Sequence, residues 1–482
     1  MMHLYKIQGN TIEIISCPPE DVPKGEYLLI QDQVAKRSLI VQVIDIGYAN
    51  IPGILEDLLR EATATEIEGR NIDPLKVESY VKMIKDAKLF TCKIRAAESN
   101  GELISDVSWI PSRSTSKIMR LSHETLVNLA EIGRKYPLPI GTTKTSSPFS
   151  IEIRAIDGKL NIITGKKETG KSHLSKLLVL GLIEYGAISL ILDINGEYTN
   201  LGFNPDQTKN RYHNQIKVLT PGQNFKVTLA YAGFKVLSDI MRSVLDLPGT
   251  SAWELRRIWE YMAQQQAISL AQLNSGIRQV ENEHIRDALI RRFESLVNSG
   301  FFTDNASEST TLEKVFTDIR DGGAFVINLR DSPSMVRQIV VEFILSKLTY
   351  LLESWIIRAV FLFAEEAHLY LRETYWDDIV TRMRHLGVFT TFITNQPDSI
   401  REGIYRQADN IFLFNFTNEH DLLTVSKAAK VDAETVTSIA RGLPPHHCLV
   451  LGKVVNELPF VVKVKSLGVK AMGQTRFFFA RD

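Results

Sequence analysis

The residues best suited to chemistry lie in one short stretch, Asn161 to Leu178, which reads NIITGKKETGKSHLSKLL. An apolar run leads into Gly165, four residues follow, and Gly170, Lys171 and Ser172 come before an apolar helical pattern. This order of strand, loop and helix is typical of a phosphate-binding loop. Backbone N–H groups at the helix start would surround the β-phosphate, Lys171 would reach the β and γ oxygens, and the Ser172 hydroxyl would bind Mg²⁺. We therefore predict a nucleoside triphosphate site.

One residue of this loop is unusual. The predicted nucleotide-binding residues are Gly165, Lys166, Lys167, Glu168, Thr169, Gly170, Lys171, Ser172 and His173. Gly165 and Gly170 are expected where a Cβ would block the backbone path. Many such loops have a third glycine where this chain has Glu168. Because a carboxylate pointing inward would repel phosphate, we expect Glu168 to face solvent or a neighbouring subunit.

A second chemical signal lies far downstream, where the apolar run 359–364 ends in Glu365 and Glu366. A buried strand that ends in two carboxylates is typical of Mg-nucleotide hydrolysis. Glu365 would support the metal through its water shell, and Glu366 would orient and deprotonate the attacking water. Together with the phosphate loop, this pattern predicts an ATPase site that uses ATP and Mg²⁺.

Other strand ends offer supporting residues. Gln396 follows a predicted strand at 388–393, where a polar side chain can sense the γ-phosphate. Arg384 precedes the same strand, so it cannot easily reach its own nucleotide but could reach a neighbour's as a finger in trans. A plain surface arginine is the alternative, and Arg382 is a second candidate for the finger. Asp193 and Glu197, both in the DINGEY motif, follow another buried strand. We therefore expect them near the nucleotide or a subunit boundary. A solvated turn is the alternative.

The elements that position these residues form a predicted order of domains. Short strands at 3–46, 89–96, 103–110 and 116–121 favour a small N-terminal β-barrel over residues 1–145, with helical patterns at 54–62 and 75–87. The proline-rich stretch 136–148 is interpreted as a linker. The nucleotide-binding core is predicted in two parts, 146–232 and 319–482, separated by a helical insertion at 233–318.

Details of the later segments are also predicted. Ser251 and Glu254 make a capping box at the start of one insertion helix, and Trp253 and Trp259 are expected in its core. Alternating residues at 460–465 predict an edge strand. The apolar end at 476–480 is expected to dock on something.

Composition limits the function classes. The 482 residues include 56 lysines and arginines against 56 aspartates and glutamates, so any positive charge for nucleic acid must be local. Cys17, Cys92 and Cys448 are widely spaced without metal-ligand spacing, which suggests reduced thiols, each a small buried side chain. No stretch has the roughly 18 apolar residues of a spanning helix. We expect a soluble, cytoplasmic protein without membrane contact.

These motifs together resemble a known family. The phosphate loop, DINGEY, FAEEAH, RHLGVF, ITNQP and ADNIFLFNFTNEHD resemble, in this order, the HerA branch of the HerA and FtsK translocase ATPases. The resemblance covers residues 146 to 482, and the N-terminal part is similar to that family's small HAS-type barrel. It implies an α/β, RecA-like P-loop NTPase domain with a helical insertion, which assembles as a homo-hexamer and moves double-stranded DNA with ATP.

The resemblance also implies roles and partners. Lys171 and Ser172 would bind ATP and Mg²⁺, Glu366 would be the catalytic glutamate, Gln396 the sensor and Arg384 the finger. Archaeal relatives work with the NurA nuclease in DNA end processing and repair, and some bacterial relatives pair with nuclease or sirtuin-like partners in antiviral defence. The implied function is a DNA translocase or helicase that feeds such a partner.

Two departures from the family pattern leave alternatives open. The family usually has aspartate where this chain has Glu365, and Glu168 stands in the phosphate loop. Either change can slow turnover or abolish it. The first alternative is an ATPase ring that scaffolds or regulates a defence effector without processive translocation. The second is a nucleotide-binding interaction module that hydrolyses nothing.

Overall fold

The structure is a computed structural model that describes residues 2–49, 85–104, 107–371, 373–416, 418–428 and 431–470. The chain forms two compact units, which are described separately below. Unit 1 contains Met1–Glu152 and Asn415–Lys463, and unit 2 contains Ile153–Phe414 and Val464–Asp482. The predicted helical patterns at 54–62 and 75–84 and the apolar end at 476–480 lie outside the described residues.

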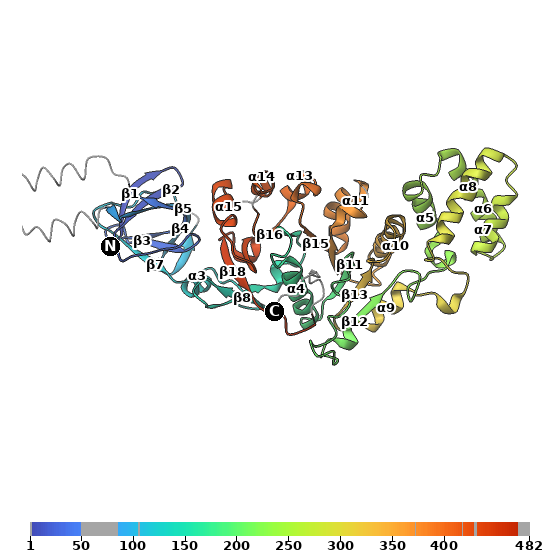
Figure 1. Cartoon of the computed structure of the whole chain (residues 1–482), viewed down its shortest axis with the longest axis horizontal. Coiled ribbons are helices and arrows are strands. Elements are labelled where there is room, and N and C mark those ends of the chain that lie inside the picture. Colours follow the sequence, from blue (N-terminus) through green and yellow to red (C-terminus); the bar gives the residue numbers. More distant parts are fainter. Residues whose placement is uncertain are drawn as a thin grey trace, which may run out of the picture. The chain divides into compact units, whose positions relative to one another are not determined.

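Unit 1 begins with an antiparallel sheet in the order β1-β2-β5-β4-β3-β7, to which β6 is added beside β5 (Figure 1). Its strands are β1 (Met2–Gln8), β2 (Thr11–Ser16), β3 (Tyr27–Asp32), β4 (Arg37–Tyr48), β5 (Lys88–Ser99), β6 (Glu102–Ile104) and β7 (Ser116–Leu121). Alternate residues such as Ile12 and Ile14 point into one apolar core. The sheet curls, so that its outer strands β1 and β7 approach each other. The strand predicted at 103–110 is present as β6 up to Ile104, and the described residues 107–110 are not in a strand.

The rest of unit 1 holds four strands in the order β17-β18-β8-β9, with short helices. These elements are α3 (His123–Leu129), β8 (Pro137–Thr143), β9 (Pro148–Glu152), α14 (Glu419–Ala428), α15 (Ala433–Ala440), β17 (His447–Gly452) and β18 (Phe460–Val464).

Two expectations for these strands were wrong. The stretch 136–148 is not a linker, because β8 and β9 pair as an antiparallel hairpin. Its prolines Pro137 and Pro139 are exposed and alternate with buried Leu138 and Ile140, so they do not interrupt the strand. The strand β18 is not an edge strand, because it lies between β17 and β8, and Lys463 is its only exposed residue.

Unit 2 is built on a parallel sheet in the order β12-β13-β11-β14-β15-β10-β16. Its strands are β10 (Asn161–Thr164), β11 (Ile188–Asp193), β12 (Ile216–Leu219), β13 (Gly323–Asn328), β14 (Val360–Glu365), β15 (Val388–Thr394) and β16 (Asn410–Leu413). The helices α4 (Lys171–Glu184), α10 (Ser334–Glu353), α11 (Glu373–Asp378), α12 (Arg384–Leu386) and α13 (Glu402–Gln407) lie among them in the sequence. Nearly every strand residue is buried, as expected for a parallel sheet with both faces covered. The predicted α/β class is confirmed.

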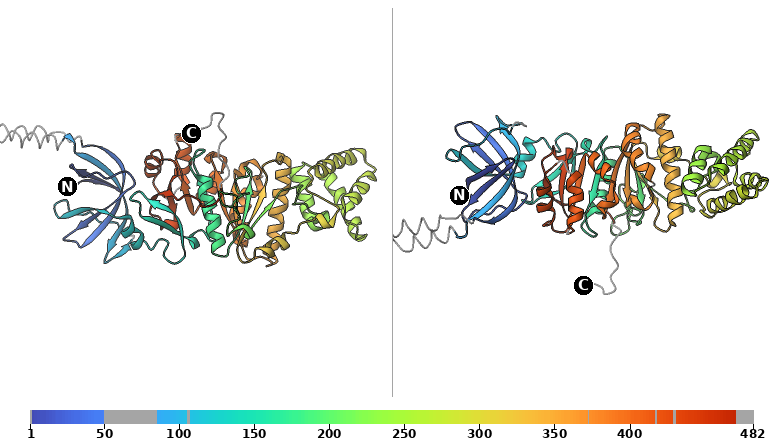
Figure 2. Two further views of the ribbon diagram at one scale, coloured as in Figure 1. Left: turned by 60° about the horizontal axis from the view of Figure 1, so that its bottom comes forward. Right: turned by 90° about the horizontal axis from the view of Figure 1, so that it is seen from above.

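A helical segment lies between β12 and β13 (Figures 1 and 2). It contains α5 (Leu229–Asp239), η3 (Ile240–Val244), α6 (Gly249–Gln264), α7 (Leu270–Arg278), α8 (Glu283–Asn298) and α9 (Leu312–Asp318). The predicted capping box is wrong, because α6 already begins at Gly249 and Ser251 lies inside it. Trp259 is buried as predicted, but Trp253 is 71% exposed. The two tryptophans are six positions apart in the sequence, which places their side chains about 120° apart around the helix.

No helix among the described residues combines the length and apolarity that crossing a bilayer requires.

Candidate nucleotide site

The phosphate loop and the two carboxylates meet at one edge of the parallel sheet. Strand β15 pairs with β10 on one side and with β14 on the other, both in parallel register. The loop that follows β10 and the carboxylates that end β14 therefore lie at the carboxyl ends of near neighbours, where ligands bind in open α/β sheets. Electrostatics agree with this placement. Burial lowers the pKa of Lys171 to about 8, and the nearby carboxylates of Glu366, Glu365 and Glu197 oppose that shift.

The loop has the shape of a phosphate cradle. A Cβ on Gly165 would lie 2.4 Å from the Cβ of Phe414, so only glycine fits there. Gly170 has a φ of 113°, in the left-handed region that favours glycine. Lys171 Nζ donates to the Lys166 carbonyl oxygen at 2.8 Å, and so does Thr169 Oγ1 at 2.8 Å. The ammonium therefore folds back onto a loop oxygen, the kind of acceptor that a phosphate oxygen would replace.

The remaining loop residues lie further out. Lys166, Lys167 and Glu168 are exposed, as expected for Glu168, whose φ of 63° is a conformation that glycine adopts more easily. Ser172 is half-buried in the first turn of α4. The next residue, His173, hydrogen bonds through Nε2 to the carbonyl oxygen of Lys465 at 2.7 Å. The segment that follows β18 thus runs beside the phosphate-loop helix.

Glu366 is fixed by the end of β15. Its carboxylate accepts from Thr394 Oγ1 at 2.9 Å and from the Asn395 backbone N–H at 3.2 Å. Its own N–H donates to the Ile393 carbonyl oxygen at 2.8 Å. Glu366 has a φ of 43°, a strained conformation of the kind that gathers at functional sites. Gln396 is exposed beyond this strand end, where its N–H donates to Thr394 Oγ1 at 3.0 Å.

Glu365 lies deeper and is incompletely paired. It is 2% exposed, and Tyr198 Oη donates to its Oε1 at 3.0 Å, while its Oε2 has no hydrogen-bond partner among the residues that the structure describes. Burial raises the pKa of Glu365 well above its ordinary value, and the neighbouring Asp193 and Glu197 raise it further. An unpartnered buried carboxylate oxygen beside Lys171 and Ser172 fits a hydrated Mg²⁺ bound with a nucleotide. When bound, the ion would supply positive charge at the phosphates.

Asp193 is buried and Glu197 is half-buried, so the alternative of a solvated turn is wrong. Asp193 accepts from the N–H groups of Tyr198 at 2.9 Å and Glu197 at 3.0 Å and so shapes the turn after β11. Burial raises the pKa of Asp193. Glu197 lies 3.2 Å from Lys176 Nζ on α4. Sequence reasoning missed Lys176 and Tyr198, although both lie inside the quoted motifs.

Arg384 lies at the opposite edge of the sheet. Its Nε donates to the Gly158 carbonyl oxygen at 3.0 Å and its Nη2 to Asp409 Oδ2 at 2.7 Å. Asp409 also accepts from the Leu160 N–H at 3.1 Å, at the amino ends of β10 and β16. The structure therefore does not bring Arg384 to the phosphate loop of its own chain. Arg382 is half exposed, with Nη2 3.5 Å from Glu353 Oε1.

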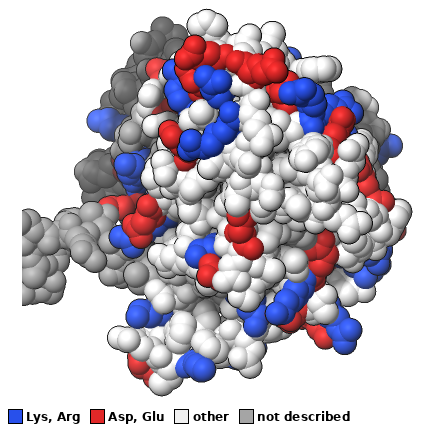
Figure 3. Space-filling model, turned by 90° about the vertical axis from the view of Figure 1, so that its right-hand side faces the viewer, with Lys and Arg blue, Asp and Glu red and all other residues white. Residues whose placement is uncertain are grey.

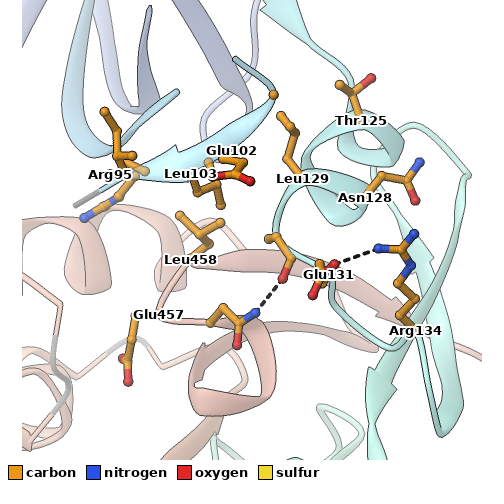
Figure 4. Close-up of a pocket in the computed structure, with 15 residues that line it drawn as sticks. Arg95, Glu102, Leu103, Thr125, Asn128, Leu129, Glu131, Arg134, Glu457 and Leu458 are labelled. Atoms are coloured by element: carbon orange, nitrogen blue, oxygen red, sulfur yellow. Dashed lines mark hydrogen bonds and ion pairs between the residues drawn. The ribbon is translucent and has the colours of Figure 1, made fainter. Parts of the chain in front are cut away.

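A hollow of about 1060 Å³ lies in unit 1 (Figure 4). Its lining includes Arg95, Glu102, Asn128, Glu131, Arg134 and Glu457. Arg134 is paired with Glu131 at 2.7 Å, and Arg95 is bound by neighbouring side chains. Nowhere in the described ranges do three or more His, Cys, Asp or Glu side chains gather as a metal site would require. The nucleotide site of unit 2 is therefore the better candidate for chemistry.

Comparisons with known proteins agree with this geometry. The family model described as "Helicase HerA, central domain" matches residues 138–348. A search of curated proteins found no match. Among solved structures, VirB4 of Thermoanaerobacter pseudethanolicus is 14% identical, with a TM-score of 0.54 over 70% of this chain and 98% of that chain. The bacterial conjugative coupling protein TrwBdeltaN70, in its trigonal form in complex with sulphate, is 14% identical, with a TM-score of 0.51 over 72% of this chain and 92% of that chain.

The two structural likenesses support the fold of the nucleotide-binding unit, and the family match covers the phosphate loop, α4, β11 and the helical segment. The resemblance predicted from the motifs is confirmed. Over residues 138–348, the chain is similar to the central domain of the helicase HerA.

Proposed function

We propose that this protein hydrolyses ATP with Mg²⁺ and uses the energy to move double-stranded DNA as a homo-hexameric ring. The observation that carries the proposal is the approach of Lys171, Glu365 and Glu366 to one another at the carboxyl edge of the sheet. Lys171 and Ser172 bind the phosphates and the ion, Glu365 holds the ion's water, and Glu366 takes the proton of the attacking water. Gln396 senses the γ-phosphate from the end of β15.

The finer architecture belongs to the same proposal. The curled sheet of unit 1 acts as a small barrel that docks a partner, either a NurA-type nuclease or a defence effector. The helical segment from α5 to α9 is an insertion in the ATPase core. Such a ring would act in DNA end processing or in defence against phage.

ATP turnover tests the motor. The wild type, Lys171→Ala and Glu366→Gln should be compared with and without linear duplex DNA. We expect DNA to stimulate the wild type, and Glu366→Gln to lose at least about a hundredfold in rate, as expected when a catalytic base is removed. Lys171→Ala should lose its turnover because the phosphates are no longer held. Glu366→Gln should still bind ATP, whereas Lys171→Ala should not. Absence of turnover in the wild type would favour the interaction module that only binds nucleotide.

One observation favours the second candidate, an ATPase ring that regulates an effector. On the face of the helical segment, positive and negative side chains are interspersed around an uncharged area (Figure 3). Two of its arginines are paired, Arg256 with Glu260 at 2.9 Å and Arg257 with Glu254. Duplex DNA binds to concentrated positive charge, which this face does not present. Turnover that is unchanged by DNA would support the regulator.

The arginine finger needs its own experiment, because Arg384 is bound to Gly158 and Asp409 in this structure. We propose that Arg384 is released from these acceptors and reaches the nucleotide of a neighbouring copy. Arg384→Ala and Glu366→Gln are each expected to be inactive, while a mixture of the two should regain turnover. In the mixed ring, some sites combine an intact Arg384 with an intact Glu366. If only Arg382→Ala complements in this way, the finger is Arg382.

A further inference from the structure

We propose that Tyr198 is a positioning residue that holds Glu365 for the metal and links that carboxylate to the phosphate-loop helix. The inference rests on the proposed function, since it concerns the Mg-nucleotide site. Sequence reasoning gave no role to Tyr198, the last residue of the DINGEY motif.

The hydroxyl of Tyr198 joins two elements of the site. The side chain is fully buried, and Oη donates to Glu365 Oε1 at the end of β14 at 3.0 Å. The same hydroxyl is hydrogen bonded to Ser175 Oγ on α4. Since the Tyr198 hydroxyl hydrogen goes to Glu365, Ser175 Oγ is the donor in this bond and Tyr198 Oη is the acceptor. Ser175 lies one turn beyond Ser172, whose carbonyl oxygen is 3.1 Å from Ser175 Oγ and is the alternative acceptor for the same hydrogen. The two hydroxyl groups therefore connect α4, whose first turn carries the predicted metal ligand Ser172, with Glu365.

The position of Tyr198 is itself fixed. Its N–H donates to Asp193 Oδ2 at 2.9 Å, which anchors the backbone to the end of β11. Lys176 Nζ lies 5.4 Å from the centre of the tyrosine ring and is paired with Glu197. Contacts from strand β11, helix α4 and strand β14 thus hold the Tyr198 hydroxyl in one position.

This arrangement has a consequence for the two oxygens of Glu365. Tyr198 occupies Oε1, whereas Oε2 is buried and finds no partner within the described part of the chain. Glutamate has one more rotatable bond than the aspartate usual at this position, so a free side chain would lose more entropy when it is ordered. A hydrogen bond to Oε1 orders the carboxylate beforehand and leaves Oε2 for the ion's water. Partners of this kind commonly change metal affinity by about 10- to 100-fold.

The test is the dissociation constant of ATP, measured with Mg²⁺ and with EDTA, for the wild type and Tyr198→Phe. The variant keeps the ring and loses only the hydroxyl. We expect the strengthening of ATP binding by Mg²⁺ to fall about tenfold, in line with lost metal-site partners, while binding in EDTA stays unchanged. The matched control is Tyr212→Phe, which removes another tyrosine hydroxyl hydrogen bonded to a glutamate, Glu184 at the far end of α4. It should leave both constants unchanged.

Two further variants make the result decisive. In a Glu365→Gln background, Tyr198→Phe should cause no additional loss of the Mg²⁺ effect, because it acts through that carboxylate. Ser175→Ala should lower the Mg²⁺ effect less than Tyr198→Phe does. It replaces Tyr198→Phe in the test if that variant does not fold. An equal loss of ATP binding with and without Mg²⁺, or an undiminished effect in the Glu365→Gln background, would overturn the proposal. The proposed function is tested separately by measuring ATP turnover of the wild type, because the comparison of ATP dissociation constants does not depend on hydrolysis.

Discussion

Each unit contains a buried network of charged side chains, and the two networks differ in completeness. In unit 1, Arg95 donates to Gln42 Oε1 at 3.1 Å, to Asp432 Oδ2 at 3.0 Å and to Thr435 Oγ1 at 2.6 Å. In unit 2, Glu365 Oε2 has no partner in the described ranges, and Lys171 turns back onto its own loop. A complete network stabilises a fold, whereas an incomplete one keeps polar groups ready for a ligand. Removing a charge should therefore have opposite effects on stability in the two places.

The largest effect is expected for Arg95→Met. The variant keeps most of the volume, but Gln42 Oε1 loses its donor and Asp432 loses its charged partner, keeping only the N–H and hydroxyl of Thr435. We expect unit 1 to lose about 3 kcal/mol of stability, the usual order for breaking a buried pair. Hydrogen exchange of the β4 and β5 amides measures this locally, and ATP binding should not change. As a control, Arg134→Met breaks an exposed pair and should cost less than about 0.5 kcal/mol. Equal losses in the two variants would show that the Arg95 network has no special role.

The opposite sign is expected for Lys171→Met. Burial lowers the pKa of Lys171 to about 8, so the folded chain carries a costly ammonium at neutral pH. Without nucleotide, the variant should gain about 1 to 2 kcal/mol at pH 7, measured by hydrogen exchange of β10 and β14. The wild type becomes more stable as the pH rises through about 8 toward 10.5, because its folded state loses the proton first. The gain should therefore shrink over that range.

A suitable control for Lys171→Met is Lys314→Met, because Lys314 is an exposed lysine on α9. This variant should change little at any pH. Loss of stability in Lys171→Met would mean that the neighbouring carboxylates outweigh burial, and the proposed contrast between the two networks would then be wrong.

His123 tests whether unit 1 also contains an incompletely paired group. Its buried Nδ1 has no hydrogen bond to any described residue and lies 3.6 Å from Glu26 Oε2. Burial, with the charge of Lys144, lowers the pKa of His123 to about 4. Unit 1 should therefore be most stable above pH 6.5 and lose stability as the pH falls toward 4. Burial raises the pKa of Glu26, which opposes this loss, so we expect a net change of about 1 kcal/mol.

The experiment compares hydrogen exchange of β3 at pH 7 and pH 4.5 in the wild type and in His123→Phe. The variant should lose the destabilisation at pH 4.5 and keep only the opposite change from Glu26, whereas the matched change at the exposed His3 should keep the wild-type behaviour. A destabilisation at low pH that survives His123→Phe would assign it to a group other than His123.

The sequence predicted the two ends of the site but not the contacts between them. Lys171 and Glu366 each follow an apolar strand, and parallel strands must present their carboxyl ends at one edge. Tyr198 carried no such signal, because its value lies in a hydroxyl that reaches two other elements only after folding. Composition also misled at Pro137 and Pro139, where prolines suggested a linker. Exposed alternate positions of a strand accept proline when its missing N–H is not needed.

The smallest effect is expected for Glu168→Gly, which tests a departure visible in the sequence. Glu168 has a φ of 63°, a left-handed conformation that costs a non-glycine residue about 1 kcal/mol. Glycine removes that strain, and part of the gain is offset by its greater freedom in the unfolded chain, so unit 2 should gain about 0.5 kcal/mol. Removing a negative charge beside the phosphates should also tighten ATP binding by roughly two- to fivefold at low salt. The control is Lys36→Gly, because Lys36 has a φ of 52° in the turn between β3 and β4. It should stabilise unit 1 without changing ATP binding.

Weaker ATP binding in Glu168→Gly would show that the carboxylate helps to hold the loop open for the nucleotide. The departure from glycine would then be an adaptation of the site rather than a burden on it.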